Sequence, residues 1–397
     1  MPGDKSVSHR ALILGAVAEG VTEACGFLAG EDCLATAECL RQLGVVIEQE
    51  GSKARVIGRG LGGLLPPENV LYVGNSGTTL RLLTGLLAGQ KFDSVLDGDA
   101  SIRRRPMDRV NVPLSLMGAR ILGDFAPVRI EGAKLQAIHY KMPINSAQVK
   151  SAILLAGLYA QGETVVEELG AGLTRNHTEN MLEYMKKTGD KGLIGRKIVV
   201  PGDFSSAAFF IVAACLLGDE KGLLIENVGL NPTRTGLLDA LECMGSQIEV
   251  KNHKMTGGEE VGDVFVQKSS LAAITLEGDA VPRMIDEVPV FAVAACLARG
   301  VTVIKDAGEL AVKESNRIAA MAGELGKMGA KIEQRADGMI IHGGQQLRGA
   351  VVESFEDHRV AMALAMAGLA ARGETVIRGA ECVNVSFPGF FEMLLSL

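Results

Sequence analysis

The sequence contains no tryptophan and few aromatic residues of any kind. Its 397 residues include four tyrosines and twelve phenylalanines, and aromatic side chains make up 4% of the chain. Proteins that bind single-stranded nucleic acid stack bases on exposed aromatic rings, so this composition argues against such a surface. The formal net charge of −7 also excludes an overall basic footprint. We therefore expect no nucleic-acid partner.

Long apolar runs and paired cysteines are missing as well. No run approaches the ~18 apolar residues of a membrane span, so we expect no membrane partner. The opening residues do not read as a signal or transit peptide. The seven cysteines are scattered without a Cys-x-x-Cys pair, which is typical of reduced thiols in a cytoplasmic protein. The six histidines show no metal-ligand spacing, so we expect no metal.

The chain does contain a sixfold internal repeat. In each copy an apolar helix ends at a glycine, a short β-branched run follows, and a second helix comes next. The first glycine recurs at intervals of 69, 73, 60, 78 and 73 residues, at Gly20, Gly89, Gly162, Gly222, Gly300 and Gly373. A second glycine closes the second helix at Gly44, Gly118, Gly189, Gly245 and Gly329. This period exceeds that of solenoids, and the length exceeds one core, so two domains are expected.

The first two copies place cations and hydrogen-bond donors at the helix start. Lys5, Ser6 and Arg10 open the first helix, where free N–H groups and the helix dipole favour an anion. In the second copy, Gly77 permits a close approach to the backbone. Of the three arginines at 103–105, Arg105 before Pro106 is the favoured anion ligand. Capped, solvated helix starts and a surface charge run are the alternatives.

The third and fourth copies are explained largely by helix capping. Residues 145–150 and 201–206 are rich in side-chain donors, which N-caps alone can account for. Gln148 and Lys150 go beyond what capping needs. Residues 174–177 form another polar helix entry.

The last two copies add carboxylates and further cations. Asp286 opens an apolar helix over 288–297, where an acidic residue is ordinarily a dipole partner. Lys313 and Arg317 are four residues apart, which predicts one helix face and leaves open a plain salt-bridge ladder. Arg359 follows a histidine at the last helix start. Together these helix starts favour a small, multiply anionic substrate gripped between two domains.

At this point the chain resembles a known family, that of 5-enolpyruvylshikimate-3-phosphate synthase. The motifs that carry the resemblance are residues 2–10, 74–78, 105–107, 146–151, 313–317 and 357–359. They occur in family order between Pro2 and Phe391. The resemblance implies an α/β fold of the inside-out α/β barrel type, with two lobes and six βαβαββ repeats, three per lobe. The expected lobes are residues 4–200 and 201–397, with residues 1–3 near the crossover.

The resemblance also implies an activity. Members transfer the enolpyruvyl group of phosphoenolpyruvate to the 5-hydroxyl of shikimate 3-phosphate and release phosphate, by addition and elimination through a tetrahedral intermediate. This is a step of aromatic amino-acid biosynthesis in the shikimate pathway. No cofactor is implied, the partners are the two small anionic substrates, and a monomer is expected.

Site residues follow from the matching motifs, residue by residue. Shikimate 3-phosphate is assigned to Lys5, Ser6, Arg10, Ser146, Ala147, Gln148, Thr174, Arg175, Asp286 and Lys313. Phosphoenolpyruvate is assigned to Lys5, Asn75, Gly77, Arg105, Gln148, Arg317 and Arg359. The implied catalytic residues are Lys5, Asp286, Lys313, Glu314 and His358. Asp286 is expected on the attacked hydroxyl, and a lysine with a carboxylate is suited to proton transfer.

The chain departs from the family pattern in places. Val385 precedes Ser386 where a lysine is often found, which puts one phosphate contact in question. Ala147, His177 and Glu309 resemble the second, bacterial class of the family, which is often less sensitive to glyphosate. Inhibitor sensitivity is left open.

Two alternatives to this function remain. UDP-N-acetylglucosamine enolpyruvyl transferase shares the fold and chemistry but should carry a reactive cysteine beside the arginine cluster. No cysteine lies between Cys39 and Cys215, which counts against it. A non-enzymatic repeat protein used for interaction would need a broad exposed face instead of these helix starts.

Overall fold

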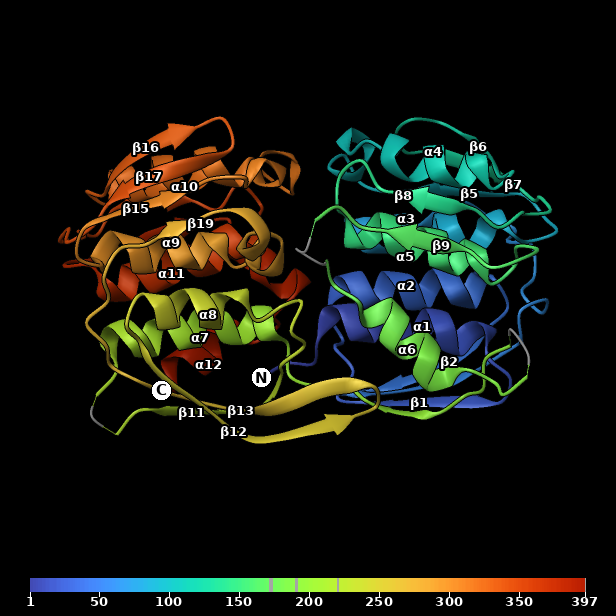
Figure 1. The fold of residues 1–397 in the computed structure, drawn as a ribbon, viewed down its shortest axis with the longest axis horizontal. Coiled ribbons are helices and arrows are strands. Elements are labelled where there is room, and N and C mark those ends of the chain that lie inside the picture. Colours follow the sequence, from blue (N-terminus) through green and yellow to red (C-terminus); the bar gives the residue numbers. More distant parts are fainter. Residues whose placement is uncertain (171–173, 190–191, 220, 397) are drawn as a thin grey trace. The chain divides into compact units, whose positions relative to one another are not determined.

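The chain is described here by a computed structural model that covers residues 1–170, 174–189, 192–219 and 221–396. These residues divide into two units (Figure 1). The N-terminal unit comprises residues 2–201 and 255–259. The C-terminal unit comprises residue 1, residues 202–254 and the chain from residue 260 onward.

The N-terminal unit alternates helices with short strands. In chain order these are α1 (Lys5–Val17), β1 (Val21–Cys25), α2 (Glu31–Gln42), β2 (Val46–Glu50), β3 (Lys53–Ile57), β4 (Leu71–Tyr72), α3 (Gly77–Ala88), β5 (Ser94–Asp97), η1 (Ile102–Arg104), α4 (Asp108–Leu116), β6 (Arg120–Leu122), β7 (Val128–Glu131), β8 (His139–Lys141), α5 (Ala147–Gly157), β9 (Val165–Glu167), α6 (His177–Met185) and β10 (Lys197–Val199). The strands form three sheets, with orders β10-β1-β3-β2, β4-β5-β7-β6 and β8-β9.

The C-terminal unit follows the same alternation. Its elements are α7 (Phe204–Leu217), β11 (Leu223–Gly229), α8 (Gly236–Cys243), β12 (Gln247–Thr256), β13 (Glu259–Gln267), β14 (Thr275–Leu276), η2 (Gly278–Ala280), η3 (Pro282–Met284), α9 (Val288–Leu297), β15 (Val301–Ile304), η4 (Gly308–Val312), α10 (Arg317–Lys327), β16 (Lys331–Arg335), β17 (Gly338–His342), β18 (Val351–Glu353), α11 (His358–Ala370), β19 (Val376–Arg378), η5 (Ala380–Val385) and α12 (Phe390–Leu395). The sheet orders are β11-β13-β12, β14-β15-β17-β16 and β18-β19.

The predicted βαβαββ pattern is complete in the second and fifth copies. Strands β4 and β5 pair in parallel around α3, and β7 joins β5 and β6 in antiparallel pairs. Strands β14 to β17 repeat this arrangement around α9 and α10. In the first copy, the parallel partner of β1 is β10, which comes from the end of the third copy. The sheets of the third and sixth copies have two strands each.

Apolar helices lie inside each unit and the strands cover them (Figure 1). Every residue of α1 from Val7 to Val17 is buried, as is every residue of α9 from Val288 to Cys296. A helix that is apolar on all sides must be enclosed by protein. The strands instead alternate: β3 buries Ala54 and Val56 and exposes the residues between and beside them. One face of each sheet therefore packs on helices, and the predicted α/β architecture is confirmed.

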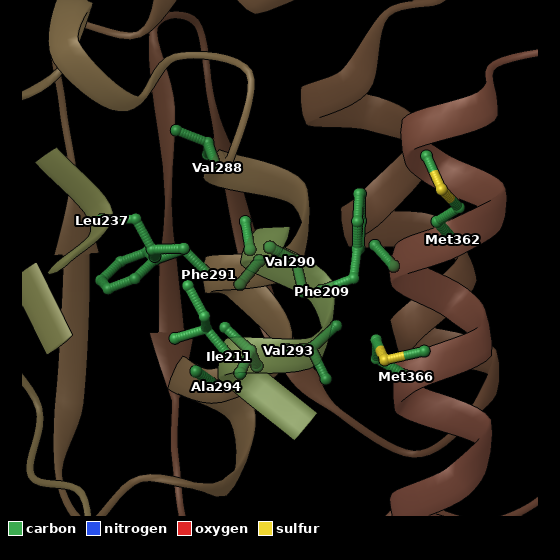
Figure 2. Close-up of a cluster of buried hydrophobic side chains, with 14 of the residues drawn as sticks. Phe209, Ile211, Leu237, Val288, Val290, Phe291, Val293, Ala294, Met362 and Met366 are labelled. Atoms are coloured by element: carbon green, nitrogen blue, oxygen red, sulfur yellow. The ribbon is translucent and has the colours of Figure 1, made fainter. Parts of the chain in front are cut away.

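Side chains from four helices pack together in the core of the C-terminal unit. Figure 2 shows side chains of α7, α8, α9 and α11 packed together, among them Phe209, Ile211, Leu237, Val290, Phe291, Val293, Met362 and Met366. Each is at most 1% exposed. Burying one such side chain contributes about 1.5–3 kcal/mol, so this cluster holds the helices in place.

Four of the five glycines predicted to close the second helix of a copy do so in the left-handed conformation. Gly44, Gly118, Gly245 and Gly329 have φ between 83° and 94° and each lies two residues after its helix ends. This left-handed conformation is the common glycine C-cap. The prediction that Gly189 closes a helix is wrong, because α6 ends at Met185 and the next residue, Lys186, turns extended and bridges to Leu193.

A buried histidine joins the first three helices of the chain. His9 Nδ1 lies 2.7 Å from Thr36 Oγ1, which in turn lies 2.7 Å from Thr79 Oγ1. Burial, followed by the charges of Lys5 and Arg10, lowers the pKa of His9 well below its ordinary 6.5. His9 is therefore neutral at pH 7, and its protonation opposes folding.

We predict that His9 makes the stability of the chain fall in mild acid. Because its folded pKa lies below its unfolded value of about 6.5, its contribution is fully present above that pH and is lost as the pH falls below it. The slope is at most about 1.4 kcal/mol per pH unit. Urea unfolding at pH 7.5, 6.5 and 5.5 should show a smaller decline for His9→Gln than for wild type. The exposed His139→Gln serves as control, and equal declines in all three proteins would contradict the assignment.

We predict that Leu237→Ala destabilises the C-terminal unit by about 3–5 kcal/mol, the cost of a core cavity. Leu237 is 0% exposed, whereas Leu395 in the same unit is 87% exposed. Leu395→Ala is thus the matched control and should change the free energy of unfolding by less than about 0.5 kcal/mol. Similar urea midpoints for both variants would show that this cluster is not the core.

Candidate active site

The helix starts of the N-terminal unit are cross-linked by one buried arginine. Arg10 of α1 donates from Nε to Thr178 Oγ1 on α6 at 2.6 Å, and from Nη2 to Ser151 Oγ on α5 at 2.8 Å. Its third nitrogen, Nη1, donates to the carbonyl of Ser6 at 2.9 Å. Burial lowers the pKa of Arg10 to about 10, against an opposing effect led by Glu179. Arg10 thus remains charged at pH 7 and holds α1, α5 and α6 together.

Lys5 is the first residue of α1 and is held by a carboxylate from α2. Its Nζ lies 2.9 Å from Asp32 Oδ2, and both side chains are largely buried, with 17% and 9% exposed. Asp4 caps the helix by accepting from the backbone N–H of Val7 at 2.9 Å. Ser6 beside it is half-buried. An oriented lysine at a helix N-terminus is an anion-binding arrangement.

Gly77, the first residue of α3, lies between two guanidinium groups. A Cβ at this position would be 2.8 Å from Arg81 Nη1 and 2.9 Å from Arg105 Nη1. Arg105 Nη2 donates to Asn75 Oδ1 at 2.7 Å, and Arg81 Nη1 donates to Gln148 Oε1 at 2.7 Å. We call these five residues the Gly77 cradle. Two positive charges around a helix N-terminus that begins with a glycine suit a phosphate or carboxylate.

The start of α5 and the segment before α6 carry the remaining predicted site residues of the N-terminal unit. Ser146 is the N-cap residue of α5, Ala147 is its first helical residue, and both are half-buried. Thr174 is 7% exposed and Arg175 follows it, two residues before α6 begins. The backbone N–H of Thr174 donates to Glu168 Oε1 at 2.8 Å.

In the C-terminal unit, Arg317 is enclosed by three carboxylates. It is 1% exposed, with Nε 2.8 Å from Asp357 Oδ2, Nη1 3.1 Å from Asp286 Oδ1 and Nη2 2.6 Å from Glu314 Oε2. Burial acts to lower the pKa of Arg317, but the three carboxylates raise it above its ordinary value. Conversely, burial acts to raise the pKa of Asp357, and Arg317 holds it below its ordinary value.

Lys313 shares a carboxylate with Arg317 although the two do not lie on one helix. Lys313 Nζ is 3.9 Å from Asp286 Oδ1 and 3.7 Å from Glu309 Oε2. The prediction of one helix face is wrong, because η4 ends at Val312 and α10 begins at Arg317. The two cations converge because both face Asp286.

The last helix start adds Arg359 and His358. Arg359 Nη2 is 3.6 Å from Asp286 Oδ2, and its Nη1 is 3.8 Å from Glu287 Oε1. Glu287 in turn accepts a short hydrogen bond from Ser205 of α7. His358 is the first residue of α11 and is 3% exposed. Asp286 is therefore ringed by Lys313, Arg317 and Arg359.

The predicted site residues are divided between the two units. The N-terminal group contains Lys5, Ser6, Arg10, Asn75, Gly77, Arg105, Ser146, Ala147, Gln148, Thr174 and Arg175, and the C-terminal group contains Asp286, Lys313, Glu314, Arg317, His358 and Arg359. The partners Asp32, Glu287 and Asp357 were missed. Glu287 offered a signal, since a second acidic residue before an apolar helix exceeds what its dipole needs.

The described ranges hold neither a metal-binding cluster nor a membrane-spanning helix. They contain no group of three or more histidine, cysteine, aspartate or glutamate side chains placed to hold a metal ion. Within the same ranges, every helix is too short or too polar to span a bilayer.

The sequence of this chain matches a family model and curated proteins that bear the same name. Residues 1–394 match the family described as EPSP synthase (3-phosphoshikimate 1-carboxyvinyltransferase). The 3-phosphoshikimate 1-carboxyvinyltransferase of Thermoanaerobacter sp. (strain X514) is 53% identical over 406 residues, covering 99% of this chain and 95% of that protein. The protein of the same name from Bacillus thuringiensis subsp. konkukian (strain 97-27) is 50% identical over 412 residues, covering 100% and 95%.

Solved structures agree with the sequence comparison. A structure of EPSP synthase from Acinetobacter baumannii superposes with a TM-score of 0.86 at 46% identity and covers 100% of this chain and 94% of its own. This bears out the two-lobed fold that the sequence motifs implied. The chain belongs to the EPSP synthase (3-phosphoshikimate 1-carboxyvinyltransferase) family.

Proposed function

We propose that this chain transfers the enolpyruvyl group of phosphoenolpyruvate to the 5-hydroxyl of shikimate 3-phosphate and releases phosphate. Family membership along the whole chain supports this reaction. The observation that carries it is the Gly77 cradle, in which two guanidinium nitrogens lie within 2.9 Å of the place a Cβ would take at a helix N-terminus. That arrangement is built for a small anion.

Phosphoenolpyruvate has two anionic groups, and each of them needs cations. We assign its phosphate to Lys5 and the Gly77 cradle. We assign its carboxylate to Arg359 with Arg317. Arg317 faces three carboxylates in this structure, so Arg359 makes the first contact and Arg317 mainly orients Asp286 and Glu314.

Shikimate 3-phosphate is assigned to the remaining donors. Its phosphate is held by Ser146, Ala147 and Gln148 at the start of α5, together with the Thr174–Arg175 segment. Lys5, Ser6, Arg10, Asp286 and Lys313 are assigned to its ring hydroxyls and phosphate. A backbone helix start with hydroxyl donors matches a phosphate ester.

The chemistry needs one proton delivered and one removed. In the addition step, the 5-hydroxyl gives up its proton as its oxygen bonds to C2 of phosphoenolpyruvate, and C3 gains a proton. In the elimination step, C3 loses a proton and the C2–O bond to phosphate breaks. Asp286 is suited to hold the attacking hydroxyl, and Lys313 and Glu314 are suited to the proton transfers at C3. We also assign His358 to the catalytic residues. No cofactor enters either step.

We further propose that the chain acts as a monomer in the cytoplasm. All of the residues assigned above come from a single chain. All seven cysteines are free thiols, as is usual in a reducing compartment. Light scattering coupled to size-exclusion chromatography tests the first point, and cell fractionation tests the second.

We predict that phosphate release from phosphoenolpyruvate requires shikimate 3-phosphate and is lost in Asp286→Ala and Glu314→Gln. Removal of a group that moves or orients a proton should lower kcat by about 10²–10⁴-fold. Glu333→Gln, an exposed residue of β16, is the control and should retain wild-type kcat. Release with UDP-N-acetylglucosamine in place of shikimate 3-phosphate would favour the related transferase, and release with neither acceptor would refute the proposal.

We predict that Gly77→Ala raises the KM for phosphoenolpyruvate about tenfold. The added Cβ would lie 2.8 Å and 2.9 Å from the ends of Arg81 and Arg105, so both must move off the anion, and a tenfold loss corresponds to only about 1.4 kcal/mol. Gly323→Ala on α10, where a Cβ has no neighbour within 4 Å, is the matched control. An unchanged KM in Gly77→Ala would place the phosphate elsewhere.

A further inference from the structure

Lys150 is a buried lysine whose ammonium group is bonded entirely by the protein. It lies in the first turns of α5, with 5% of its side chain exposed. Its Nζ is 2.7 Å from Glu168 Oε2 and 2.7 Å from Glu179 Oε1, and it donates to the carbonyl of Thr174 at 3.3 Å. A lysine has three N–H donors, and these contacts account for all of them. Although it stands two residues after Gln148, Lys150 has no donor left for a ligand.

Lys150 and Glu168 together bind both backbone groups of Thr174, its carbonyl and its N–H. Lys150 Nζ binds the Thr174 carbonyl, while Glu168 Oε1 accepts from the Thr174 N–H at 2.8 Å and also from its hydroxyl. Since Glu168 binds Lys150 through its other oxygen, the three residues form a closed set. This set determines where Thr174 and Arg175 lie relative to the start of α5.

The same cluster balances charge beside the helix starts. Two carboxylates face one ammonium, and Glu168 is 7% exposed. The second positive charge comes from Arg10, whose pKa is raised by Glu179 against the larger lowering effect of burial. Taken together, Lys150, Arg10, Glu168 and Glu179 are neutral. Without Lys150, one of the two carboxylates would be left uncompensated next to a site for an anion, which is costly in a low-dielectric environment.

We propose that Lys150 is a positioning residue for the shikimate 3-phosphate side of the site. It holds the Thr174–Arg175 segment and neutralises Glu168 and Glu179, and it does not itself contact the phosphate. This inference rests on the proposed function, because it concerns the binding of that substrate. It separates Lys150 from Gln148, which belongs to the Gly77 cradle and binds Arg81 and Thr78.

The first test is Lys150→Met, assayed for both substrates. Loss of the buried charge partner should raise the KM for shikimate 3-phosphate and its Kd by isothermal titration calorimetry about 10- to 100-fold. The KM for phosphoenolpyruvate and kcat should change less than about threefold, a split that a general loss of structure would not produce. Lys186→Met is the control, because Lys186 forms an exposed ion pair with Glu183 on α6.

The decisive variant is the double substitution Lys150→Met and Glu179→Gln. It leaves one carboxylate, that of Glu168, for the one remaining cation, Arg10, and Glu168 still accepts from the Thr174 N–H. Its KM for shikimate 3-phosphate should therefore return to within about threefold of wild type. It also carries the test if Lys150→Met does not fold. A double variant as impaired as Lys150→Met would show that the site needs the lysine itself and not its charge balance, and would overturn the inference.

The remaining outcomes are also distinct. If the wild type is active and Lys150→Met has the same KM for shikimate 3-phosphate, this inference is wrong and the proposed function is unaffected. A wild type that neither binds nor turns over shikimate 3-phosphate contradicts the proposed function, and this inference with it.

Discussion

Complete burial of the apolar helices is the constraint on which the rest of this structure depends. Helices such as α1 and α9 are enclosed along their length, so a polar side chain is tolerated only near their ends. The unbonded N–H groups of the first turn require partners there. Because the sequence repeat occurs six times, polar and charged side chains recur at equivalent helix starts. Within each of the two units, packing of the helices brings starts such as those of α1, α5 and α6 together. The candidate site is thus a consequence of how the core is built.

Buried charge at these helix starts is held by explicit pairing, and the pairing differs between the units. Arg10 is surrounded mainly by hydroxyl and carbonyl oxygens, and burial lowers its pKa to about 10. Arg317 faces three carboxylates, which raise its pKa above the ordinary value despite burial. The first arrangement links three helix starts through uncharged partners, whereas the second fixes three carboxylates in place.

Much of the local structure could be predicted from sequence, and the errors have local causes. The helix over 288–297 was predicted from its apolar run and has those bounds. The single helix face for Lys313 and Arg317 failed because Asn316 caps a new helix, accepting from the N–H of Ala319 at 3.1 Å. Spacing of four residues is compatible with a helix but does not require one. The prediction that a helix ends at Gly189 was wrong for a similar reason, since a glycine permits a helix end without fixing where it occurs.

The sequence by itself determined the sixfold repeat, the apolar helices and the residue types at their starts, since these depend on periodicity and composition within one copy. It also carried the motifs that mark the family. Only the tertiary structure decided the partners: Asp32 for Lys5, Asp357 for Arg317 and Thr178 for Arg10 lie 27, 40 and 168 residues apart in sequence. Whether a lysine such as Lys150 meets a ligand or a glutamate depends on which helices pack beside it. No local pattern encodes that neighbour, because burial and pairing of charge are properties of the assembled core.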